Sequence, residues 1–183
     1  TCIQDAGVRD LRMRVILLLL AFFAGCSRNP SGSWTMTSED AGLNGTIELT
    51  GQKFFRVRVK SKDVDTAGAG LATAGRVAVC LGTGCRVRVL IEKFGNWRGM
   101  ATDGLRTTDE SWEKSGQDLI GPAGKKPLGG NAMPGPNQFI AELHDQVVLA
   151  DDAEGLILLD LARDSGRGEI IRPSGKKSIT LRR

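Results

Sequence analysis

The sequence has no tyrosine, a single histidine and only three tryptophans among its 183 residues. One imidazole cannot form a zinc site without help from carboxylate and thiolate ligands. Two acidic loops, residues 63–65 and 151–155, supply only part of the oxygen shell that calcium needs, so we expect no metal ion and no other cofactor. A net charge of +4 is small for this length, and basic residues alternate with acidic ones, which argues against a nucleic-acid partner.

The chain is rich in turn residues, with 24 glycines and six prolines between short apolar stretches. This composition is typical of all-β proteins. Nine segments have the β-branched or large apolar residues of strands, and most of them alternate: 34–37, 46–50, 54–60, 76–81, 85–92, 138–143, 146–149, 156–161 and 178–181. We therefore predict an antiparallel β-sandwich of jelly-roll or Greek-key type, with a short helix over 108–114 and a long irregular loop over 121–137.

The N-terminal part of the chain has a different character. Residues 12–14 (Arg-Met-Arg) precede an apolar run over residues 15–24, which ends in Gly25 and Cys26. The run is too short to cross a bilayer as a mature helix. With its basic start, apolar run and small residues before a cysteine, the segment 13–26 resembles the lipobox signal peptide of bacterial lipoproteins. The resemblance implies cleavage before Cys26 and attachment of a diacylglycerol to its sulfur.

This resemblance sets the expected domain organisation. We expect an upstream, non-native segment over residues 1–12, a signal peptide over 13–25, a flexible tether over 26–33 and the β-sandwich domain over 34–183. The resemblance further implies a protein anchored in the cell envelope by lipid. A serine after the lipidated cysteine implies delivery to the outer membrane, with the domain facing the periplasm or the cell surface. An envelope polymer or another protein would then be its partner.

Two cysteines of the expected domain lie close together. Cys80 and Cys85 flank the segment 82–84 (Gly-Thr-Gly), which is typical of a hairpin turn. An oxidising compartment favours a disulfide between them. The hydrophobic register of a three-residue hairpin opposes the bond, because it places the two cysteines on opposite faces of the sheet. A β-bulge would reconcile the two, and both outcomes stay open.

Two segments, 55–60 and 86–91, alternate apolar residues with basic ones. Side chains alternate across a strand, so we expect their valines to face a core and their cations to stand in water. If the two strands are neighbours, the cations form one basic surface that would attract phosphate-bearing polymers or lipid headgroups. A solvated face that discourages edge pairing is the alternative. The candidate binding face consists of Arg56, Arg58, Lys60, Arg86 and Arg88.

These features favour a lipid-anchored binding or structural module over an enzyme. One alternative is an envelope hydrolase in which His144 acts as general base with a Ser or Asp from residues 94–137. Within that segment, Ser111 and Lys114 have the spacing of a lysine-activated serine on a helix. Another alternative is a carbohydrate-binding module that stacks sugar rings on exposed indoles, although such modules commonly use tyrosine too. Its candidate residues are Trp34, Trp97 and Trp112.

Overall fold

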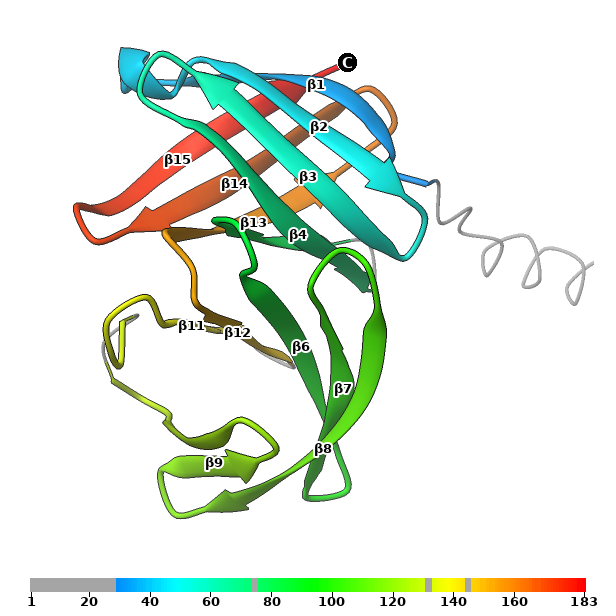
Figure 1. The fold of residues 1–183 in the computed structure, drawn as a ribbon, viewed down its shortest axis with the longest axis vertical. Helices are drawn as coiled ribbons and strands as arrows, with labels where there is room; N and C mark the ends of the chain where they lie inside the picture. The colour runs from blue at the N-terminus through cyan, green and yellow to red at the C-terminus, as the bar shows by residue number, and fades with distance from the viewer. Residues whose placement is uncertain (1–28, 74–75, 131–132, 144–145) are drawn as a thin grey trace, which may run out of the picture.

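The computed structural model describes residues 29–73, 76–130, 133–143 and 146–183. These residues form two antiparallel β-sheets (Figure 1), so the predicted all-β class is confirmed. The architecture differs from the expected sandwich, because one sheet closes into an eight-stranded barrel and the other is a curved sheet of seven strands. No helix in the described parts of the chain is long and apolar enough to cross a bilayer.

The barrel has the strand order β1-β15-β14-β13-β5-β4-β3-β2, and its interior is filled by side chains. Alternation explains the filling: in β3, Phe55, Val57 and Val59 point inward and are buried, while the residues between them are exposed. The strands are β1 (Gly32–Ser38), β2 (Gly45–Gly51), β3 (Phe54–Ser61), β4 (Asp65–Thr73), β5 (Arg76–Leu81), β13 (Gly155–Leu161), β14 (Ser165–Arg172) and β15 (Gly175–Arg182). A short 3-10 turn, Ala41–Leu43, joins β1 to β2.

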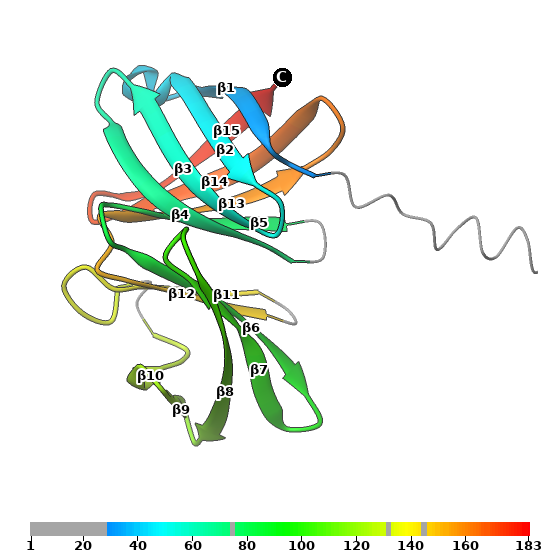
Figure 2. The same cartoon turned by 45° about the vertical axis from the view of Figure 1, so that its right-hand side comes forward.

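The second sheet has the order β10-β9-β8-β7-β6-β12-β11 and curls below the barrel (Figure 2). Its strands are β6 (Arg86–Lys93), β7 (Asn96–Thr102), β8 (Thr107–Ser115), β9 (Asp118–Gly121), β10 (Gly124–Pro127), β11 (Phe139–Glu142) and β12 (Gln146–Asp151). The central strands are buried on both faces. In β12, Val148 faces the barrel, while Val147 and Leu149 face the inside of the curl.

An apolar layer joins the barrel to the second sheet. From the barrel it takes outward-facing residues such as Ala78 and Leu156, and from the second sheet it takes Val87 and Val89. Residues 156–159 of β13 are all apolar, without alternation, which predicts a strand buried on both faces. This is confirmed, since Leu156 enters the layer while its neighbour Ile157 enters the barrel. Because this layer is continuous, the two sheets form one packed body.

The predicted cysteine hairpin is wrong, because β5 pairs with β4 and β13 and not with β6. The chain leaves the barrel after Leu81 and starts the second sheet at Arg86. Gly82 permits this corner with a φ of 123°, which a glycine adopts at little cost. A disulfide joins Cys80 to Cys85 across the corner, with 6.1 Å between their Cα atoms. Both sulfurs reach the apolar layer. Because the two cysteines do not lie on paired strands of one hairpin, no hairpin register places them on opposite faces.

The predicted helix over 108–114 is also wrong, because these residues belong to strand β8. Glu110 and Trp112 alternate with exposed neighbours and are buried in the curl of the second sheet. The expected loop over 121–137 contains strand β10, which forms a hairpin with β9.

The entry segment before β1 is held against the barrel. The Ser31 hydroxyl donates to the Leu49 carbonyl at 2.8 Å, and the Trp34 indole N–H donates to the Pro30 carbonyl at 2.9 Å. The Arg183 guanidinium lies 4.7 Å from the centre of the Trp34 ring, and its Nη2 donates to the Ser31 carbonyl at 2.8 Å. The last part of the expected tether is thus fixed, whereas Cys26 lies outside the described residues.

Candidate functional site

A cleft of about 560 Å³ lies where the barrel wall diverges from the second sheet. Strands β4, β5, β13, β14 and β15 line one side of it, and β6 and β12 line the other. The apolar layer between the sheets supplies its floor, so the cleft is the exposed margin of that layer. The floor residues are Ala78, Val89, Leu143, Val148 and Leu158.

The rim of the cleft is polar and has balanced charge. The Arg76 Nε donates to the Asp160 carboxylate at 3.0 Å, and both side chains are about half exposed. Arg167 and Glu169 of β14 add one further charge of each sign. A rim without net charge gives no preference for a charged ligand. A volume in this range and an apolar floor with a few polar groups are typical of small-molecule sites.

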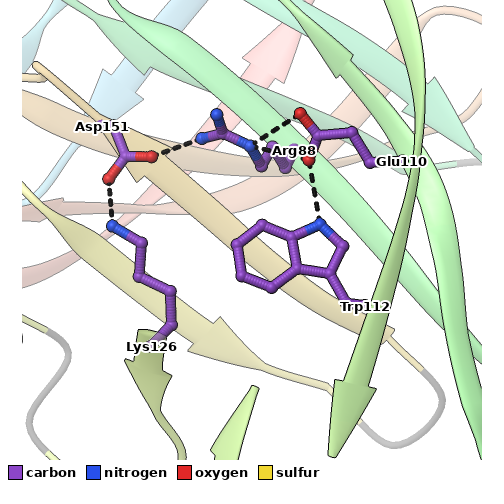
Figure 3. A network of polar contacts seen from close by, with 5 residues as sticks. All are labelled: Arg88, Glu110, Trp112, Lys126 and Asp151. Carbon is purple, nitrogen blue, oxygen red and sulfur yellow. Dashed lines mark hydrogen bonds and ion pairs between the residues drawn. The ribbon is translucent and has the colours of Figure 1, made fainter. Parts of the chain in front are cut away.

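A second feature is a network of buried charges inside the curl of the second sheet (Figure 3). The Arg88 Nε donates to the Glu110 carboxylate at 2.9 and 3.2 Å, and its Nη1 donates to Asp151. The Lys126 Nζ donates to the other oxygen of Asp151 at 2.6 Å. The Trp112 indole N–H donates to Glu110 at 2.9 Å.

This network is neutral as a unit, which explains how it can be buried. The side chains of Arg88 and Lys126 are each only 5% exposed, and an unpaired charge at such depth would be costly. Each carboxylate receives a cation, and Arg88 contacts both carboxylates. Lys126 lies on the edge strand β10 and Asp151 at the end of β12, so their ion pair ties together the two sides of the curl.

A polar pocket of about 430 Å³ lies beside the charge network, lined by residues that include Arg86, Arg88, Lys126 and Asp103. Hydrogen bonds from the backbone N–H groups of Arg106 and Leu105 lower the pKa of the Asp103 carboxyl below its ordinary value. Asp103 therefore stays ionised at neutral pH, and the pocket holds charges of both signs.

The structure does not bring the predicted basic residues together. Arg56, Arg58 and Lys60 stand on the outer wall of the barrel, where Arg58 lies 3.5 Å from Asp65. Arg86 and Arg88 belong to the second sheet, so the two strands are not neighbours and the condition for one basic surface is not met. Arg88 is also buried, because the curl of its sheet covers the face on which it stands.

Two further predicted groups, the serine–lysine pair and the three tryptophans, do not form the expected sites. Ser111 and Lys114 lie on a strand, where residues three apart point to opposite faces, so they form no catalytic pair. The indoles of Trp34, Trp97 and Trp112 are buried and are not free to stack on a sugar ring. His144 lies outside the described residues.

Within the described segments, no group of three or more His, Cys, Asp or Glu residues could hold a metal ion. In the acidic loop 151–155, both oxygens of Asp151 are occupied by Arg88 and Lys126. No protein-family model, curated protein or solved structure matches the chain. The cleft and the N-terminal motif therefore carry the functional conclusion.

Proposed function

We propose that this chain is a lipid-anchored binding module of the cell envelope that holds an uncharged, partly apolar ligand in the cleft between barrel and second sheet. The observation that carries the binding role is the combination of an apolar floor, including Leu158 and Val148, with a rim of balanced charge. The lipobox-like segment 13–26 supports the anchor.

An anchor of two or three acyl chains holds a protein on a membrane far more firmly than a single chain does. It also concentrates the cleft at the membrane surface, where a weak binding site can still be occupied. The amphipathic chemistry of the cleft suits a molecule with a short apolar part and a neutral polar part. In this proposal the domain projects from the outer membrane into the periplasm or to the cell surface.

The anchor predicts a defined chemical product. In protein purified from bacterial membranes, we expect the chain to begin at Cys26 and to carry a diacylglyceryl thioether. Intact-mass measurement and mass spectrometry of the N-terminal peptide test this. A chain that still contains residues 13–25 and has a free thiol at Cys26 would contradict the anchor.

Binding in the cleft predicts that Leu158→Gln weakens the affinity for an uncharged apolar fluorophore such as N-phenyl-1-naphthylamine. Loss of apolar contact with one leucine costs about 1–2 kcal/mol, so the dissociation constant should rise by roughly tenfold. Fluorescence titration of the full chain in detergent-free vesicles, after subtraction of the signal from protein-free vesicles of the same lipid, measures this change.

Leu161→Gln is the matched control, because Leu161 lies on the same strand, is also partly exposed and packs against the barrel core outside the cleft. It should leave the dissociation constant unchanged. Equal weakening by both variants, or by neither, would remove the cleft as the binding site.

A further inference from the structure

We propose that one end of the barrel docks on an anionic bilayer surface and fixes the orientation of the domain. We call it the tether end; its described parts are residues 29–31, the turns 52–53 and 162–164, and Arg183. The opposite, far end consists of turns 39–44, 62–64, 82–84, 152–154 and 173–174, with the adjoining start of β15, residues 175–177. This inference rests on the proposed lipid anchor at Cys26.

The chain between the barrel and the proposed anchor is short. Pro30 is held to the barrel through Trp34, and only four residue steps separate it from Cys26. Four fully extended residues span at most about 14 Å. A barrel strand of eight residues such as β3 is roughly 26 Å long. The anchor can therefore bring the tether end to the headgroups, but it cannot do the same for the far end.

Charge is distributed unequally between the two ends of the barrel. The exposed turn residues at the tether end include three cations and one anion: Lys53, Arg163, Arg183 and Asp164. Those at the far end include three cations and five anions: Lys62, Lys176, Lys177, Glu39, Asp40, Asp63, Asp152 and Glu154. Anionic headgroups attract basic residues within a Debye length, so they favour the tether end and repel the far end.

The tether end also has an exposed aromatic residue. Phe54 is the first residue of β3, follows Lys53 at the tether end and is 36% exposed. A phenylalanine beside basic residues is typical of surfaces that enter the headgroup region. Reach, charge and the aromatic side chain thus select the same end of the barrel, and the occupant that fits all three is an anionic lipid surface.

The test measures which end of the barrel lies near the headgroups. The full chain, taken from bacterial membranes, is reconstituted in vesicles of phosphatidylglycerol and phosphatidylcholine. A fluorophore is attached at Gln52→Cys in the tether end or at Ser174→Cys in the far end, both exposed turn positions. The buried disulfide sulfurs of Cys80 and Cys85 do not react. Lipids with a spin label on the headgroup then quench the fluorophore by proximity.

We expect several-fold stronger quenching at position 52 than at position 174. The variant Lys53→Glu/Arg163→Glu should reduce this difference, whereas Lys62→Glu/Lys176→Glu, which changes the net charge equally at the far end, should preserve it. Equal quenching at both positions in a protein whose Cys26 carries lipid would overturn the docking proposal alone. A bare Cys26 and no attachment to vesicles would overturn the anchor, and the docking with it.

Discussion

Arg88→Ala is expected to lower the free energy of unfolding by about 3–5 kcal/mol, the usual cost of removing one partner from a buried ion pair. Without the guanidinium, Glu110 loses its only cation in the network and Asp151 keeps only Lys126. Both carboxylates would remain buried in the curl of the second sheet. Urea denaturation of the full chain, followed by tryptophan fluorescence, measures the loss, because Trp112 lies in contact with the network.

The matched control is Arg58→Ala on the outer wall of the barrel. Arg58 lies 3.5 Å from Asp65, but both side chains are more than half exposed. Exposed ion pairs contribute about 0–1 kcal/mol, so this variant should be nearly as stable as the wild type. Similar losses for the two variants would show that the buried network does not stabilise the second sheet. Arg88→Lys should fall between them, since a single ammonium group lacks the planar fork that contacts both carboxylates.

Removal of the disulfide, as Cys80→Ala/Cys85→Ala, is expected to lower the stability by about 2–3 kcal/mol. The bond closes a short loop, for which the chain-entropy model predicts about 2 kcal/mol, and the loss of two buried sulfurs from the apolar layer adds to this. Thermal unfolding with and without the substitutions measures the effect.

The same bond should resist reduction in the folded protein, because Cys80 and Cys85 are 0% and 1% exposed. We expect no free thiol from this pair in dithiothreitol alone, and rapid reaction once urea unfolds the chain. Fast reduction under native conditions would mean that the corner between the sheets opens often. In that case the disulfide would not fix the geometry of the corner.

Alternation along the chain predicts which residues share a face, but it does not predict what covers that face. β3 and β6 both alternate valine with arginine, and in both the valines are buried as expected. Arg58 faces water because the outer wall of the barrel at β3 is uncovered, whereas Arg88 faces the curl formed by strands distant in the sequence. Whether each arginine is exposed or buried thus depends on strand pairing between distant parts of the chain, which the local sequence pattern does not predict.

Other differences between the predicted and observed secondary structure have local causes. Residues 108–114 have a capping residue and early acidic residues that favour a helix, but burial of Trp112 and Glu110 against β6 and β7 favours the strand. β4 and β14 are absent from the predicted strands, because they have many small residues in place of β-branched ones. A side chain at Gly168 would place its Cβ 2.1 Å from the Leu158 carbonyl oxygen, so close strand approach requires glycine there.

The cleft was beyond prediction for a related reason. Its lining comes from seven strands between β4 and β15, and none of their sequences has a recognisable binding motif. The cysteine pair gave the only local signal near the junction of the sheets. Its hairpin interpretation failed, because a corner between two sheets and a turn within one sheet can share the same glycine-rich sequence.

The cleft extends to the end of the barrel that is nearest the entry segment, and this affects how a ligand can reach it. Thr73, Arg76 and Asp160, which lie at the ends of β4, β5 and β13 nearest the entry segment, belong to its lining. On a domain seated as proposed, this end of the cleft is the one nearest the lipid leaflet. A sparingly soluble molecule could then pass between leaflet and protein by lateral diffusion, with almost no exposure to bulk water.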